Sequence, residues 1–163
     1  MSRRTYRIGN YAMPTTAFPT PVTTGTSIKT MLQVKPASSI SVIGWGYSFD
    51  IAPTAVVKVE LLTTGTVNAT VTASVAADAA KYDDPSAGVS TVTFATSGTG
   101  YTSSAEGSVT TTRELDVRQA WEQSYDMRYE LGREPGVVAA DILRIRVTTA
   151  TAINMLCYII YEE

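Results

Sequence analysis

The sequence contains no histidine and only one cysteine. Without histidine it cannot form a Ser-His-Asp or Cys-His catalytic set, an HExxH motif or a histidine-bearing zinc site, and it has no phosphate loop of the GxxxxGK[ST] type. One cysteine excludes an intramolecular disulfide. Cys157 lies in an apolar run, where we expect a small buried side chain and not a reactive thiol. We therefore expect a protein that is not an enzyme, with no catalytic residues, no metal and no cofactor.

Long hydrophobic runs are also missing. No stretch approaches the ~20 apolar residues that cross a bilayer, and the first residues, MSRRTYR, are not followed by the apolar core of a signal peptide. We expect a protein made and kept in a cytoplasm, with no membrane partner. The net charge of −2 gives no general attraction to nucleic acid. Arg3, Arg4 and Arg7 alone would support only weak, salt-sensitive binding, so we expect no nucleic-acid partner.

Threonine is plentiful, at about one residue in seven, and it is spread through short alternating apolar runs. Such runs are typical of β-strands, because threonine packs well on a pleated surface. In one run Val57, Val59 and Leu61 alternate with Lys58 and Glu60, which predicts a half-buried antiparallel strand.

The run over residues 40–49 is more aromatic. Successive side chains of a strand point to opposite faces, so Ile43, Trp45, Tyr47 and Phe49 lie on one side, which we expect to face the core. The glycines of this run fall on the opposite side, where a neighbour can approach closely.

The remaining pattern predicts an all-β protein. We expect residues 55–62 and 67–75 to form a hairpin and residues 76–106 to form a long surface excursion. Its acidic residues Asp78, Asp83 and Asp84 lack calcium-loop spacing, so we expect a solvated loop. Further strands are predicted at 89–95, 108–117, 125–131, 143–147 and 153–161, and short helical turns at 117–123 and 137–141. Eight or nine strands predict a jelly-roll-like antiparallel β-sandwich over residues 27–163.

Residues 1–26 differ in composition from the rest, with several prolines and single aromatic residues among threonines. Proline favours extended backbone, so this segment predicts an N-terminal arm without a core of its own. A disordered terminus is the alternative. Arginines and spaced aromatics suit an arm that lies across a neighbouring subunit. The candidate interface residues of the arm are Arg3, Arg4, Tyr6, Arg7, Tyr11 and Phe18.

The β-domain has three candidate interface residues of its own. Trp121 is flanked by polar residues, which indicates a position near a surface or interface. Arg144 and Arg146 point the same way from one strand. They form either a solvated or salt-bridged face or a surface for an acidic partner.

Six short segments of the chain share a resemblance to one family of proteins: 26–33, 43–50, 59–65, 131–135, 143–147 and 152–162. They resemble the head decoration, or cement, proteins of tailed bacteriophages. The resemblance implies a jelly-roll-like β-domain on the outside of the capsid, as a symmetric oligomer attached in part through an extended terminus.

The expected function follows from both observations. The protein would bind the major capsid protein on the virion exterior and bridge neighbouring subunits, as a homo-oligomer that is a trimer rather than a dimer. The alternative is a carbohydrate-binding or host-attachment module, which would need a cleft with exposed aromatic and convergent polar groups.

Overall fold

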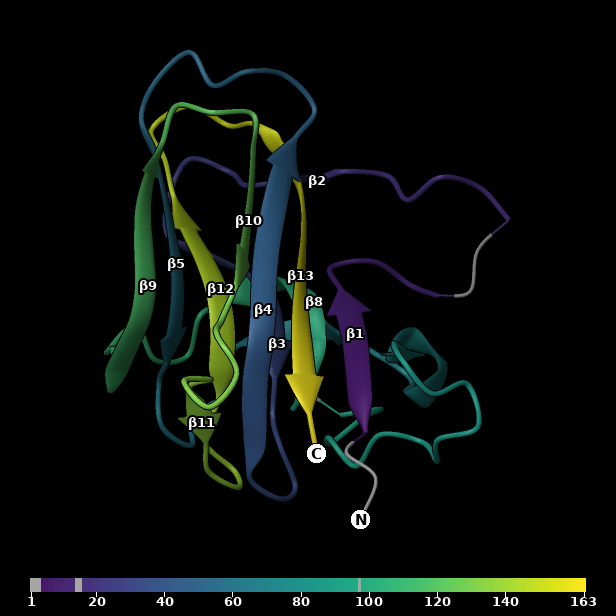
Figure 1. Ribbon diagram of the computed structural model, residues 1–163. Helices are drawn as coiled ribbons and strands as arrows, with labels where there is room; N and C mark the ends of the chain where they lie inside the picture. Colours follow the sequence, from purple (N-terminus) through teal and green to yellow (C-terminus); the bar gives the residue numbers. More distant parts are fainter. Residues whose placement is uncertain (1–3, 14–15, 97) are drawn as a thin grey trace.

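The chain forms two antiparallel β-sheets packed face to face, as the computed structural model shows for residues 4–13, 16–96 and 98–163 (Figure 1). Sheet A has the strand order β10-β4-β13-β1-β7, with β11 added to β4 and β2 added to β13. Its strands are β1 (Thr5–Gly9), β2 (Val22–Thr23), β4 (Ile40–Phe49), β7 (Ala80–Lys81), β10 (Ser124–Arg128), β11 (Gly136–Val137) and β13 (Asn154–Glu162).

Sheet B has the order β6-β8-β3-β12-β5-β9. Its strands are β3 (Lys29–Val34), β5 (Val57–Thr63), β6 (Thr70–Ala73), β8 (Gly100–Ala105), β9 (Arg113–Ala120) and β12 (Leu143–Thr148). The described residues include one 3-10 turn, η1 (Ala76–Asp78), and no α-helix. The predicted antiparallel β-sandwich is confirmed, whereas its jelly-roll-like character stays a prediction.

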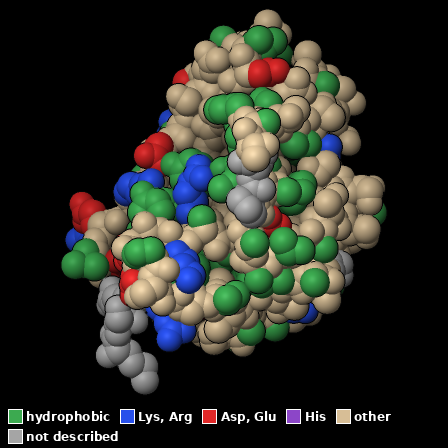
Figure 2. Space-filling view, turned by 90° about the vertical axis from the view of Figure 1, so that its right-hand side faces the viewer, with side chains coloured by type: hydrophobic (Ala, Val, Ile, Leu, Met, Phe, Trp, Pro, Cys, Tyr) green, Lys and Arg blue, Asp and Glu red, His purple; other side chains and the backbone are tan. Residues whose placement is uncertain are grey.

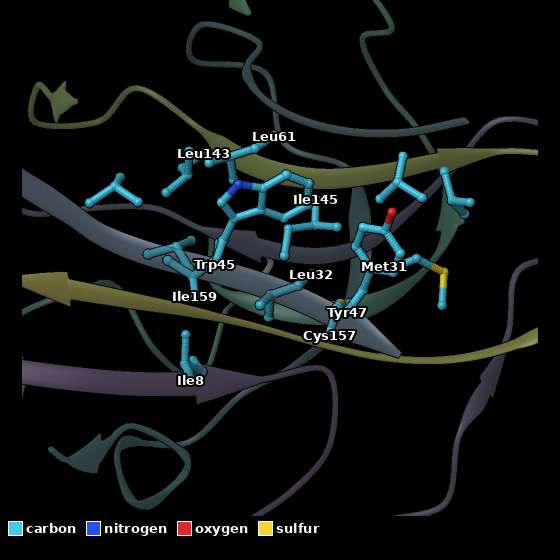
Figure 3. Close-up of a cluster of buried hydrophobic side chains, with 14 of the residues drawn as sticks. Ile8, Met31, Leu32, Trp45, Tyr47, Leu61, Leu143, Ile145, Cys157 and Ile159 are labelled. Atoms are coloured by element: carbon cyan, nitrogen blue, oxygen red, sulfur yellow. The ribbon is translucent and has the colours of Figure 1, made fainter. Parts of the chain in front are cut away.

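The core lies between the sheets and is built from the inward positions of their strands. Trp45 and Ile159 of sheet A face Leu61, Leu143 and Ile145 of sheet B, and all are fully buried (Figure 3). On β5 the predicted alternation is confirmed, with Val57, Val59 and Leu61 buried and Lys58 exposed, and Leu62 beyond them is buried as well. Burying each such side chain contributes roughly 1.5–3 kcal/mol, so the inward positions supply most of the driving force.

On β4 the predicted alternation is wrong for Ile43, the first of the four residues expected to face the core. Trp45, Tyr47 and Phe49 face the core as expected, but Val42 is the next buried residue and Ile43 is only half-buried. The register against β13 shifts between Ile160 and Tyr161. A β-bulge at this point therefore turns Ile43 out of the core side.

The predicted hairpin of residues 55–62 and 67–75 is also wrong. Strand β5 pairs with β12 and β9, whereas β6 pairs with β8 at the opposite edge of sheet B. The Gly65 turn carries the chain across the sheet to its other edge instead of reversing it onto β5. Alternation fixes which residues face inward, but it does not choose the partner strand.

Other local predictions in the irregular regions fail as well. Residues 89–95 form no strand, residues 117–120 continue β9, and residues 137–141 form no helix. Asp78 is buried and not solvated, because its carboxylate accepts hydrogen bonds from the backbone N–H groups of Met13 (2.5 Å) and Val75 (2.8 Å). The acidic loop thus contains a structural carboxylate.

The N-terminal segment belongs to the sandwich, which corrects the predicted boundary between an arm at 1–26 and a domain at 27–163. Strand β1 pairs with β13 along its whole length and with β7 on its other side. Tyr6 and Ile8 are fully buried in the core. Their alternation with Arg7 is an ordinary strand signal, which the prolines further along the chain obscured.

We expect Tyr6→Ala to destabilise the fold by about 3–5 kcal/mol, the usual cost of deleting a buried aromatic ring. The Tyr6 ring stacks on Tyr161 with centroids 5.7 Å apart, and its hydroxyl donates to the Gly88 carbonyl at 2.8 Å. Urea unfolding measures this change. Phe18→Ala is the control, because that ring is 80% exposed, and it should stay within about 0.5 kcal/mol of the wild type. Equal effects of the two variants would contradict the placement of β1.

Candidate binding surfaces

The structure separates the six candidate residues of the predicted arm. Arg3 lies outside the described residues, and Tyr6 is part of the core and cannot contact a partner. Arg4 is exposed and lines a polar hollow with Asp84 and Glu163. The six residues therefore do not form one continuous interface.

Arg7 and Tyr11 do come together, on the outer face of sheet A. An Arg7 guanidinium nitrogen donates to the Tyr11 hydroxyl at 2.9 Å. The same guanidinium lies 4.4 Å from the ring centroid of Tyr158 on the neighbouring strand β13, which is cation–π geometry. The sequence analysis missed Tyr158. Its outward direction could have been inferred, because Tyr158 follows the buried Cys157 and successive side chains of a strand point to opposite faces.

Three glycines make this outer face flat. The Cβ that an alanine would add at each position would lie only 2.5–2.8 Å from a neighbouring side chain, closer than packed atoms tolerate. The side chain of Tyr11 covers Gly9, that of Arg128 covers Gly44, and that of Tyr158 covers Gly46. The predicted close approach at the β4 glycines is confirmed. Tyrosine and arginine side chains therefore pack as a layer directly on the sheet.

Hydrogen bonds and ion pairs connect this layer. The Tyr158 hydroxyl donates to the Asp126 carboxylate, and Arg128 lies 3.8 Å from the same carboxylate oxygen. Burial and the bond to Asp126 raise the pKa of Tyr158 to about 12. The phenol therefore keeps its proton at neutral pH and serves as a fixed donor.

A cleft of about 380 Å³ opens within this surface. Its lining includes the aromatic residues Tyr11 and Tyr158, and it includes Ser48 and Ser124, which lie opposite each other on adjacent strands. This cleft, called the sheet A cleft below, collects hydroxyl, charged and aromatic groups from β1, β4, β10 and β13.

Phe18 lies on a projecting loop that interrupts a strand. Strands β1 and β2 pair in succession along the same side of β13, ending at Gly9 opposite Tyr158 and resuming at Val22 opposite Met155. Between these strands lie residues 10–21, of which the described parts, 10–13 and 16–21, extend away from the sandwich (Figure 1). We call this segment the β1–β2 loop. Its Phe18 is 80% exposed.

Asn10 fixes the start of this loop and is fully buried. Its side-chain amide donates to the Met155 carbonyl at 3.0 Å, and its side-chain oxygen accepts from the Cys157 N–H at 2.9 Å. At the far end the Thr24 N–H donates to the Ile153 carbonyl at 2.8 Å. Both ends of the loop are thereby tied to β13 or the turn before it. Figure 2 views the molecule from this side, where hydrophobic side chains form several patches among polar ones and most of the visible Lys and Arg lie on the left.

Arg144 and Arg146 do not form a partner surface. They point outward from β12, but residues 106–111 lie over them, and their exposed fractions are 0% and 4%. Arg144 donates to the carbonyls of Val67, Glu106 and Ser108 at 2.5–3.1 Å. Of the two interpretations, the structure supports salt-bridged arginines over a surface for an acidic partner, and these salt bridges lie inside the protein.

Each arginine also has a carboxylate partner. Arg144 lies 3.5 Å from Glu106, and Arg146 lies 3.2 Å from Glu60. Burial lowers the pKa of Arg144, while Glu106 opposes this change. Arg146 also donates to the Val109 carbonyl at 2.8 Å. Together the two arginines fasten the segment that joins β8 to β9 onto sheet B.

The two tryptophans occupy the environments predicted for them. Trp45 is fully buried, and its indole N–H donates to Asp116 at 3.2 Å. Trp121 is 59% exposed in the turn between β9 and β10. Cys157 is buried, as expected, and burial raises the pKa of its thiol. Trp121 thus remains available to a partner, whereas Trp45 does not.

No group of three or more potential metal ligands occurs among the described residues. Within the same ranges, no helix is long and apolar enough to cross a membrane. No protein-family model matches the chain, and no curated protein matches it.

Arg144→Met should destabilise the protein by about 3–5 kcal/mol, because it leaves the partly buried Glu106 carboxylate without its cation and three carbonyls without their donor. Denaturant unfolding measures the effect. Arg133→Met is the control, since Arg133 and Glu130 form an ion pair with both side chains about 80% exposed, and it should change stability by less than about 0.5 kcal/mol. A change in the free energy of unfolding no larger than that of the control would contradict the stabilising role of the bonds that Arg144 makes.

Tyr158→Phe should make the protein less sensitive to alkali. The pKa of Tyr158 is raised from 10 to about 12 in the folded state, so its stabilising contribution is complete below pH 10 and lost as the pH rises through 12. Thermal unfolding midpoints measured from pH 9 to 12 should fall less steeply in the variant than in the wild type. Parallel curves would contradict the environment described for this phenol.

Proposed function

We propose that this protein is a structural component of a tailed-phage virion that binds the outer surface of the capsid and stabilises the head by bridging neighbouring capsid subunits. The single observation that supports this most is the β1–β2 loop with Phe18 at its exposed position. The resemblance of six sequence segments to head decoration proteins supports the same function.

The loop suits the attachment role that we first expected of a free arm. A large aromatic ring exposed to water gains free energy when a partner covers it, and such rings dominate the binding energy of many interfaces. Pro19 and Pro21 restrict the backbone on one side of Phe18. Anchors at both ends reduce the entropy lost on binding further than a free tail could.

Stabilisation of the head then follows from repetition. A protein that contacts several capsid subunits adds contacts that must break before the subunits separate, which favours the assembled state. In a homo-oligomer, with a trimer expected over a dimer, several loops would bind at once, and modest affinity per loop would become avidity. The partners in this proposal are the major capsid protein and further copies of this chain.

Phe18→Ser should weaken binding to capsids at least tenfold without lowering the unfolding temperature. The measurement is co-sedimentation with heads of the encoding phage assembled without this protein, and with heads of an unrelated phage. Leu131→Ser is the matched control, because Leu131 is 85% exposed in a different part of the molecule, and it should bind like the wild type.

Two results would refute the proposal. The wild-type protein could fail to sediment with heads of its own phage, or it could sediment equally with both kinds of head. If it binds its own heads specifically but Phe18→Ser behaves like the wild type, the assignment of the β1–β2 loop is wrong. Heating decorated and undecorated heads then measures how much the protein contributes to head stability.

A further inference from the structure

The sheet A cleft has the construction of a small-ligand site. Its volume of about 380 Å³ lies near the lower end of the roughly 300–1,000 Å³ usual for such sites. Phe18 is not among its lining residues, whereas Arg7 and Tyr11 are. Tyr11 is the one described residue of the β1–β2 loop that lines the cleft, so the exposed Phe18 does not account for it.

The cleft combines apolar surface with polar groups of both kinds. Leu156 and Tyr11 supply apolar surface, and Ser48 and Ser124 supply hydroxyls that can donate or accept. Hydroxyl groups spread along one side of an apolar patch suit a ligand that has hydroxyls at its edge and carbon–hydrogen bonds on its face.

The charges of the cleft are balanced. Arg7 brings hydrogen-bond donors and Asp126 brings acceptors to the same opening. One positive and one negative side chain favour a ligand without net charge over a phosphate or a carboxylate. The charged groups then bind by hydrogen bonds, which carboxylate and guanidinium groups form strongly with neutral hydroxyls.

The polar groups are also held in place before any ligand arrives. The Tyr158 ring lies against Gly46 and beneath the Arg7 guanidinium, with its hydroxyl bound to Asp126. The Tyr11 ring lies against Gly9, and its hydroxyl accepts a hydrogen bond from Arg7. Side chains fixed in this way lose little conformational entropy when they bind.

We infer that the sheet A cleft binds a neutral saccharide of one or two sugar rings, with a ring face against Tyr11 and the hydroxyls bonded to Ser48, Ser124, Asp126 and Arg7. A sugar ring has apolar faces and a hydroxyl-bearing edge, which matches the two kinds of surface in the cleft. This inference does not rest on capsid attachment, because the cleft and Phe18 are separate.

Chemical-shift titration of the full-length, isotope-labelled protein tests the inference, with maltose, lactose and chitobiose as probes. At least one sugar should shift the amide signals of Ser48, Ser124 and Leu156 in a saturable way. Ser124→Trp fills the cleft from an exposed position on the edge strand β10, and it should weaken that binding at least tenfold. Thr70→Trp is the control, at an exposed position on the edge strand β6 of the other sheet, and it should leave binding unchanged.

The outcomes separate this inference from the proposed function. If no sugar shifts these signals, or if binding survives in Ser124→Trp, the inference is wrong. If Ser124→Trp instead abolishes sedimentation with capsids while no sugar binds, the cleft is part of the protein interface and the inference is also wrong. Sugar binding lost in Ser124→Trp, with capsid binding unchanged, is the result we expect.

Discussion

A polar group removed from water has to find its hydrogen-bond partners inside the protein, and this requirement shapes the molecule outside its apolar core. Arg144 is the strongest example, because its charged side chain is completely buried. Three backbone carbonyls and Glu106 surround it. The irregular segment between β8 and β9 is thus fixed onto sheet B by hydrogen bonds to a cation. Asn10 and Asp78 act in the same way around the β1–β2 loop.

The two faces of the sandwich are consequently used differently. The outer face of sheet B is covered by its own chain where Arg144 and Arg146 emerge, so these groups are unavailable to partners. The outer face of sheet A is built on glycines and carries a layer of tyrosine and arginine. Both proposed binding regions adjoin β13, the central strand of sheet A.

The sequence predicted the class of fold and much of the core but not the connections between strands. Period-two alternation identifies the inward residues of β5 and the core position of Trp45, because a strand with one buried face must alternate. Pairing depends on long-range contacts that alternation does not encode, which is why the β5–β6 hairpin is wrong. The bulge that turns Ile43 outward likewise depends on its partner strand.

The candidate site was less predictable for a related reason. Arginine in a strand normally indicates an exposed face, and only the distant Glu106 and Glu60 permit Arg144 and Arg146 to be buried. Tyr6 was assigned to a free arm because nothing nearby in the sequence shows that β13 is its partner. Arg7 and Tyr11 were found, but the residues that complete their surface, Tyr158 and Asp126, lie more than a hundred positions away.

The anchoring of the β1–β2 loop has a mechanical consequence. Its two ends join the sandwich at neighbouring points along β13, a strand hydrogen-bonded to β4 on one side and to β1 and β2 on the other. A pull on the loop is therefore transmitted to the middle of sheet A and not to a peripheral tail. Many backbone hydrogen bonds must then yield together before the loop can detach, so the grip outlasts one that relies on a flexible terminus.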